Sequence, residues 1–162
     1  MSVDSVTALL AALALSVAAL TFAGWGYAVA SRRSPESAAA WADRREMDVP
    51  NALLVAGLVG VVMMLGSLYL SEIADFPPCR LCWYQRIAAY PLGPILLLAW
   101  FRRDWGIRPY GLLLSVIGAV ISTYHVLVEL FPQLETGACE VDNPCTIRWV
   151  ERFGFVTIPT MA

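Results

Sequence analysis

Four cysteines form two pairs whose spacing permits redox chemistry. Cys79 and Cys82 make a Cys-x-x-Cys motif, and Cys139 and Cys145 enclose a short stretch that contains Asn and Pro. At the start of a helix, a Cys-x-x-Cys pair can close a small disulfide, and exposed backbone N–H groups and nearby cations stabilise its thiolate. A disulfide in an exposed loop exchanges readily. Both pairs are therefore candidates for thiol–disulfide exchange, and two inert structural disulfides are the alternative.

Two further ionisable residues accompany these pairs. Arg86 lies one turn beyond Cys82 on the same helix face, where its guanidinium would stabilise both a Cys82 thiolate and an anionic oxygen of a bound acceptor. An arginine that only anchors a span at the membrane surface is the alternative. His125 is the single histidine and lies within an apolar segment. Ionisable groups in such segments are candidates for function, although His125 could also be a hydrogen-bonded packing residue.

The elements that carry these residues are predicted to cross a membrane. The 162 residues are 59% hydrophobic and 15% charged, and the mean hydropathy of +0.64 lies outside the usual range of soluble domains. A spanning helix needs about 20 apolar residues. One candidate span contains Pro91 and Pro94, which membrane helices tolerate when neighbours satisfy the backbone. We predict an all-α, integral-membrane four-helix bundle with spans at about residues 6–30, 51–71, 81–101 and 110–131.

The two ends of the chain receive separate predictions. Residues 1–50 are interpreted as an additional N-terminal span with a linker that forms a short helix along the inner surface. Cleavage after Ala30 as a signal peptide is the alternative, although the segment has no basic start and is long for a signal peptide. Residues 146–162 mix charged and apolar side chains, which favours a short interfacial C-terminal helix. The whole chain, 1–162, is predicted to be a single membrane domain.

Arginines predict the orientation, because the chain has no lysine. They gather between the first and second spans and between the third and fourth, at Arg32, Arg33, Arg44, Arg45, Arg102, Arg103 and Arg108. By the positive-inside rule both loops are cytoplasmic, so the N-terminus and both cysteine pairs lie outside. An oxidising face favours disulfides over a four-cysteine zinc site, and we predict no metal. The net charge of −2 gives no indication of a nucleic-acid partner, and none is predicted.

Several motifs occur in the order found in the DsbB/BdbC disulfide bond formation proteins. They are Pro-Cys-Arg-Leu-Cys-Trp-Tyr-Gln-Arg at 78–86, Tyr-His at 124–125, Asn-Pro-Cys-Thr at 143–146 and Phe-Gly-Phe-Val-Thr-Ile-Pro at 153–159. From about residue 51 to 162 the chain resembles this family. The resemblance implies a thiol:quinone oxidoreductase of the bacterial cytoplasmic membrane. Such an enzyme reoxidises a DsbA-like thioredoxin-fold protein and uses ubiquinone or menaquinone as its acceptor.

The resemblance also implies a relay. The partner would form a mixed disulfide with Cys139, Cys145 would exchange with Cys79, and Cys82 would pass electrons to the quinone. By the same match Arg86 and His125 fall on residues of the quinone site. Two other functions remain open: a vitamin K epoxide reductase-like enzyme, in which the Cys-x-x-Cys pair comes last, and a non-enzymatic scaffold with stapled loops.

The chain departs from the family pattern at both ends. The family has four spans that begin near Asn51, the last of which follows the Phe-Gly-Phe motif, where this sequence ends. This chain instead carries the additional span at 6–30, which runs in the same direction as the absent one. We expect it to pack in the vacant position. A truncated chain with a peripheral first helix is the alternative.

Overall fold

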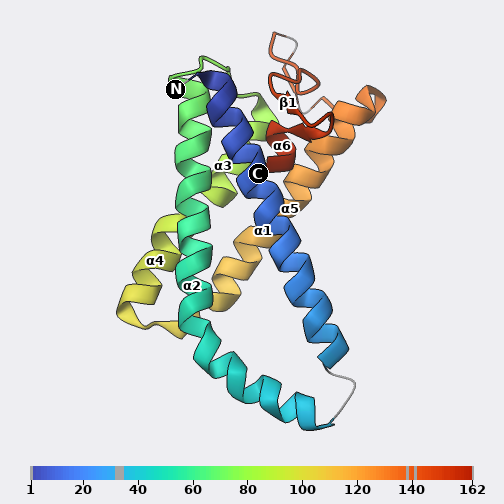
Figure 1. Cartoon of the computed structure of the whole chain (residues 1–162). Helices are drawn as coiled ribbons and strands as arrows, with labels where there is room; N and C mark the ends of the chain where they lie inside the picture. The colour runs from blue at the N-terminus through green and yellow to red at the C-terminus, as the bar shows by residue number, and fades with distance from the viewer. Residues whose placement is uncertain (1, 32–34, 138, 141, 162) are drawn as a thin grey trace.

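The computed structural model describes residues 2–31, 35–137, 139–140 and 142–161, with the side chains of 31 and 35–49 left undescribed. Arg32 and Arg33 of the first basic cluster lie outside the described residues. The chain is mostly helical, as predicted (Figure 1). Its elements are α1 (Val3–Ser31), α2 (Pro35–Glu72), α3 (Arg80–Ala89), α4 (Leu92–Arg102), the 3-10 helix η1 (Trp105–Ile107), α5 (Arg108–Leu130), η2 (Pro132–Leu134), β1 (Glu151–Arg152), β2 (Val156–Thr157) and α6 (Ile158–Met161).

Among the described residues, three helices are long and apolar enough to cross a membrane. They cover Val3–Ala30, Pro50–Glu72 and Trp105–Leu130, which confirms three of the predicted spans. The linker helix expected along the inner surface is the first part of α2, which continues through Pro50. Figure 1 shows this part bent away from the straight upper part of α2. Pro50 accounts for a bend there, because proline removes a helical hydrogen bond.

The remaining predicted span, 81–101, consists of two helices and not of one. α3 ends at Ala89 and α4 begins at Leu92, with Tyr90 and Pro91 between them. The Tyr90 N–H still bonds to the Arg86 carbonyl, at 2.9 Å, but Pro91 has no N–H to continue the series. The chain therefore turns between α3, which packs on α5, and α4, which packs on α2.

The C-terminal tail differs from the expected interfacial helix. Glu151 pairs with Thr157 and Arg152 with Val156 in a two-stranded antiparallel hairpin. Its turn contains Gly154, whose φ of 79° suits glycine better than a residue with a side chain. Only α6, four residues long, is helical. The prediction of a helix over the tail overlooked this turn, and the hairpin lies at the end of the bundle where α1 begins (Figure 1).

Two glycines set the distance between α2 and α4. A Cβ atom added at Gly93 would lie 2.7 Å from the Val61 backbone nitrogen, and one added at Gly60 would lie 2.8 Å from Gly93 Cα. Small residues let helix backbones approach closely in membranes, where dispersion drives much of the packing. The turn after α3 is held against α2 by this contact.

We predict that Gly93→Ala destabilises the bundle by about 1–3 kcal/mol, because the added methyl group has no room. The unfolding temperature in detergent should fall by about 3–10 °C. Gly26→Ala in α1 is the matched control, since a Cβ there meets nothing within 4 Å. Alanine raises helix propensity at both sites, so an equal response of the two variants would contradict the packing argument.

Candidate redox site

The two cysteine pairs, far apart in the sequence, meet in one buried cluster. Cys79 and Cys145 are 6% and 1% exposed and pack with Leu81 and Val128. Cys82 and Cys139 pack against this cluster from its edge. The fold therefore brings together all four cysteines that the sequence singled out.

The first pair sits at the start of α3 because prolines end the preceding segment. Cys79 is the N-cap of α3, and its Sγ accepts a hydrogen bond from the Cys82 backbone nitrogen at 3.4 Å. Both residues are free thiols, and their Sγ atoms lie 3.0 Å apart. A small side-chain rotation is enough to close a disulfide between them.

The second pair is a disulfide in a loop held against the first. Cys139 and Cys145 are bonded, with Cα atoms 5.7 Å apart. Arg80, which follows Cys79, forms an ion pair with Glu140, which follows Cys139, at 3.0 Å. The Asn143 side chain also donates to the Pro77 carbonyl, at 3.4 Å. These contacts align the two loops.

His125 on α5 contacts both pairs. It is 2% exposed, and its Nε2 lies 3.6 Å from Cys79 Sγ and 3.3 Å from the Cys145 carbonyl oxygen. The resemblance assigned His125 to an acceptor site, and in the structure His125 lines the same cavity as Cys79 and Cys82. An imidazole in this position can hydrogen-bond the Cys79 sulfur and take up its proton.

The hydrogen bond from the Cys82 thiol holds the pKa of Cys79 well below that of an ordinary thiol. Contact with His125 acts in the same direction, and burial opposes both. The reduced pair therefore carries its negative charge on Cys79 at neutral pH. The sequence had led us to expect an Arg86-stabilised thiolate at Cys82.

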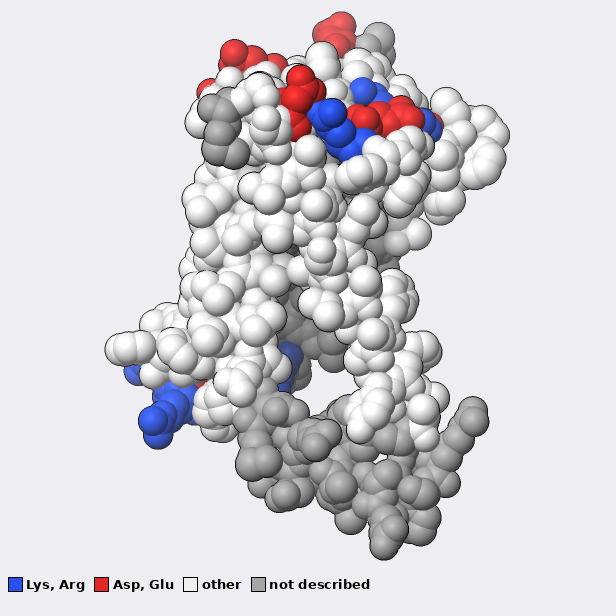
Figure 2. All heavy atoms as spheres, viewed as in Figure 1, with Lys and Arg blue, Asp and Glu red and all other residues white. Residues whose placement is uncertain are grey.

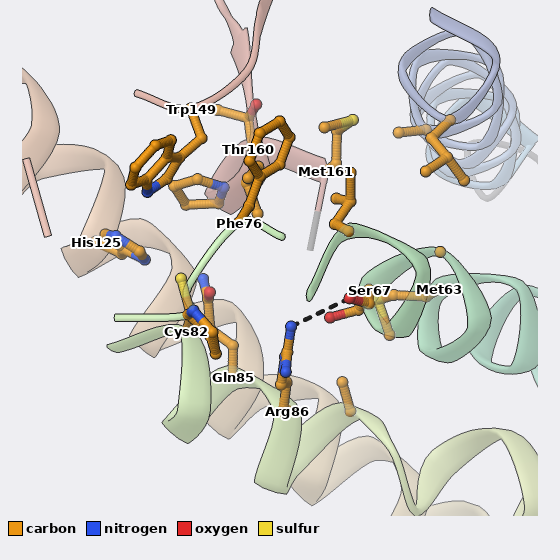
Figure 3. A pocket seen from close by; sticks show the side chains of 18 of the residues that line it. Met63, Ser67, Phe76, Cys82, Gln85, Arg86, His125, Trp149, Thr160 and Met161 are labelled. Atoms are coloured by element: carbon orange, nitrogen blue, oxygen red, sulfur yellow. Dashed lines mark hydrogen bonds between the residues drawn. The ribbon is translucent and has the colours of Figure 1, made fainter. Parts of the chain in front are cut away.

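Arg86 is held in the cavity by other groups. Its Nη2 donates to the Ser67 carbonyl of α2 at 3.1 Å, and its guanidinium lies over the rings of Trp83 and Tyr90, 5.2 and 5.9 Å from their centroids. Figure 3 shows Cys82 and Arg86 on the same side of the cavity, with the bond to Ser67. The guanidinium is therefore held by the Ser67 carbonyl and the two rings, and its Nε atom has no hydrogen-bond partner among the described residues.

The cavity has a volume of about 490 Å³ and mostly apolar walls. Cys79, Cys82 and His125 line it together with Phe76 and Trp149, whose rings stack 5.7 Å apart. Three buried polar atoms have no hydrogen-bond partner among the described residues: Gln85 Nε2, Arg86 Nε and His125 Nδ1. All three residues line this cavity. Buried donors without partners are rare, so this group fits a flat ligand with oxygen acceptors.

Sequence reasoning missed several lining residues. Gln85 stands beside Arg86 in the motif, but nothing in the sequence distinguishes it from a surface glutamine. Ser67, Trp149 and Thr160 reach the cavity from α2, the tail and α6. Only the folded structure shows that these three segments line the same cavity.

The reduced pair could also hold a thiophilic metal ion. Ligand atoms of Cys79, Cys82 and His125 lie within 4.8 Å of one another. They supply three donors, which leaves an open fourth position in a tetrahedral site. Closing the Cys79–Cys82 disulfide would remove two of these ligands.

Comparison with known proteins shows the family to which the chain belongs. The family model for the disulfide bond formation protein DsbB matches residues 50–160. The chain belongs to this family. It is 44% identical over 115 residues to the probable disulfide formation protein C of Halalkalibacterium halodurans, covering 70% of this chain and 84% of that protein. It is also 44% identical over 111 residues to the disulfide bond formation protein C of Bacillus subtilis, covering 68% and 80%. No solved structure matches the chain.

Membership in the DsbB family confirms the resemblance seen in the motifs. The family and the apolar helices together indicate a membrane disulfide oxidoreductase. The match begins at residue 50, so α1 lies outside it.

We predict that Cys82→Ala raises the pKa of Cys79, because the strongest stabilising hydrogen bond is removed. In wild type with the Cys139–Cys145 disulfide intact, thiolate ultraviolet absorbance should persist at about pH 6. A depressed pKa means that this charge is lost only as the pH falls toward the folded-state value. In Cys82→Ala the absorbance should instead appear only above about pH 7. A Cys79→Ala control identifies the titrating sulfur, and unchanged titration in Cys82→Ala would contradict this assignment.

Proposed function

We propose that this DsbB-family protein transfers electrons from a DsbA-like, thioredoxin-fold dithiol protein outside the cytoplasm to a membrane quinone. The observation that supports this most directly is the apolar cavity beside Cys82, with three unpartnered polar atoms from Gln85, Arg86 and His125. A quinone ring is flat and apolar and carries two oxygen acceptors. The polar groups and the walls suit such a molecule.

The first step is thiol–disulfide exchange at the loop. A thiolate of the partner attacks Cys139 Sγ, the Cys139–Cys145 bond breaks, and Cys145 leaves as a thiolate. Cys139 is partly exposed and Cys145 is 1% exposed, so Cys139 is the sulfur that a protein partner can reach. The second thiol of the partner then displaces Cys139 and leaves the partner oxidised.

The second step connects the two pairs. When the first pair is oxidised, the Cys145 thiolate attacks Cys79 Sγ and releases Cys82. Cys145 and Cys79 share one buried cluster, and His125 contacts both residues. Attack of Cys139 on Cys145 then restores the loop disulfide and frees Cys79. The products of this second step are a Cys139–Cys145 disulfide and free thiols at Cys79 and Cys82, which is the arrangement in this structure.

The third step reoxidises Cys79 and Cys82. Two thiols become one disulfide, and two electrons and two protons pass to the acceptor, giving the quinol. The quinone supplies the oxidising power when bound. The chain would supply the rest: Arg86 and Gln85 would donate hydrogen bonds to its oxygens, and His125 would stabilise the Cys79 thiolate that it contacts.

The charge distribution supports the proposed orientation. Arg102, Arg103 and Arg108 lie at the end of the bundle opposite the cysteine loops, where Figure 2 shows basic side chains. By the positive-inside rule this end faces the cytoplasm, and both cysteine pairs face the oxidising side.

We expect Cys82→Ser and Cys139→Ser to abolish turnover, since each removes a sulfur from the relay. Arg86→Gln should raise the quinone KM about tenfold, because a charged hydrogen bond to the acceptor is lost. The measurement is quinone reduction by the detergent-purified protein, supplied with a reduced thioredoxin-fold partner and a short-chain quinone.

Arg102→Gln is the matched control, because this arginine lies at the opposite end of the bundle. Its kinetics should equal those of wild type. A folded wild type that reduces no quinone would overturn the proposal and favour a non-enzymatic scaffold. Turnover that persists in Cys82→Ser would show that electrons leave by another route.

A further inference from the structure

The N-terminal helix α1 packs on the bundle only through its outer half. Thr7 and Ala11 are 1% and 0% exposed, and the Leu10 side chain lies against Gly66 of α2. A Cβ atom at Gly66 would lie 2.9 Å from Leu10 Cδ2. From residue 15 onward α1 is almost wholly exposed. Figure 1 shows its inner half diverging from α2.

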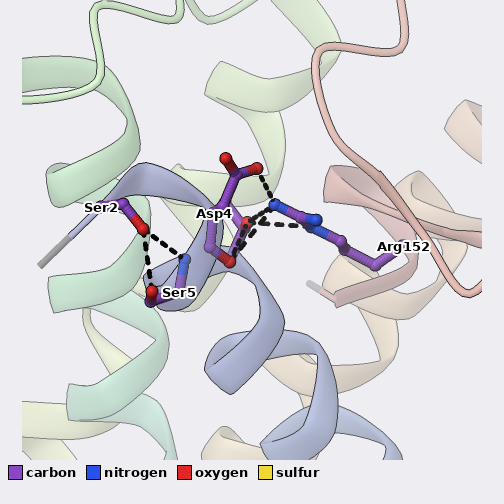
Figure 4. Close-up of polar contacts among 5 residues, drawn as sticks. Ser2, Asp4, Ser5 and Arg152 are labelled. Carbon is purple, nitrogen blue, oxygen red and sulfur yellow. Dashed lines mark hydrogen bonds and ion pairs between the residues drawn. The ribbon is translucent and has the colours of Figure 1, made fainter.

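The outer half of α1 is also tied to the C-terminal hairpin. Arg152 of β1 forms an ion pair with the Asp4 side chain and donates to the Asp4 carbonyl at 3.2 Å. Its Nη2 and Nε also donate to Thr7 Oγ1, at 2.8 and 3.1 Å. Figure 4 shows Arg152 reaching from the hairpin to the first turn of α1. We call this set of contacts the Arg152 latch.

The hairpin in turn is fixed to the helix that carries His125. Thr157 of β2 donates to the Glu129 carboxylate at 2.8 Å, and Ser122 donates to the Pro159 carbonyl. Both Glu129 and Ser122 belong to α5. The Arg152 latch therefore connects α1, through the C-terminal tail, to the helix that carries His125.

α1 supplies one wall of the cavity beside Cys82. The lining residues from this helix are small or apolar: Leu10, Leu13, Ala14, Val17 and Ala18. They face α2 residues that include Val59 and Met63. Figure 2 shows an opening between the lower parts of these two helices. The α1 and α2 residues that line the cavity are mostly apolar, so an apolar tail can lie against them.

We propose that α1 is a hinged wall of the acceptor cavity, that Arg152 is the positioning residue that holds it in place, and that the isoprenoid tail of the quinone leaves between α1 and α2. This inference rests on the proposed function. The family match begins at residue 50, so this wall is a feature of this chain beyond the matched region. The latch lies at the polar surface, where it can hold one end of α1 while the apolar end moves.

The latch should affect quinone binding and leave the thiol chemistry intact. We expect Arg152→Gln to raise the KM for a short-chain quinone about fivefold with kcat unchanged, since an ion pair and hydrogen bonds that hold the wall are lost. The rate of mixed-disulfide formation with the reduced partner, measured without quinone, should equal that of wild type. Arg108→Gln is the control, because the Arg108 side chain donates to the Trp105 carbonyl at the opposite end of the bundle.

A charge exchange separates the latch from a general loss of structure. Arg152→Asp and Asp4→Arg alone should each raise the quinone KM, and the double variant should recover most of the wild-type value. A photoreactive quinone should label residues 10–18 of wild type, and less so in Arg152→Gln. Wild-type KM in Arg152→Gln, or the absence of α1 labelling while turnover continues, would overturn the inference. Absence of quinone reduction in wild type would instead overturn the proposed function.

Discussion

The contact of His125 with both cysteine pairs is the interaction on which the site depends. A buried imidazole must find polar partners, and here they are the Cys79 sulfur and the Cys145 carbonyl. This requirement fixes the position of α5 along its axis relative to the start of α3. It also fixes the Cys139–Cys145 loop over the first thiol pair. The cavity beside Cys82 is lined by these segments together with α1 and α2.

A single apolar cavity then serves two kinds of chemistry. It reaches thiols whose charge is stabilised by the Cys82 thiol and His125. It also reaches Arg86, whose Nη2 bonds to the Ser67 carbonyl while its Nε has no partner among the described residues. Low polarity strengthens each of these interactions and makes an unpaired donor costly. These features support the proposed binding of a ligand with oxygen acceptors beside Cys82.

Much of this arrangement could be predicted from the sequence. The cysteine spacing, the apolar segments and the motif that ends in Arg86 indicated the redox centre, three spans and the family. The break at Pro91 was misjudged, because a proline in an apolar segment is compatible with both a kinked and a broken helix. The hairpin around Gly154 and the contacts of Gln85 depend on tertiary packing. The expected closure of the bundle by α1 remains a proposal, supported by its contacts with α2 and Arg152.

The most direct test is a single turnover in the absence of the thiol partner. Protein with free Cys79 and Cys82 and an intact Cys139–Cys145 disulfide is mixed with a short-chain quinone, and quinol and free thiols are counted together. The account predicts that quinol forms in an amount equal to the protein while the two thiols disappear. A Cys139→Ser/Cys145→Ser variant should give the same result. Thiols that persist beside unreduced quinone in folded protein would contradict the account.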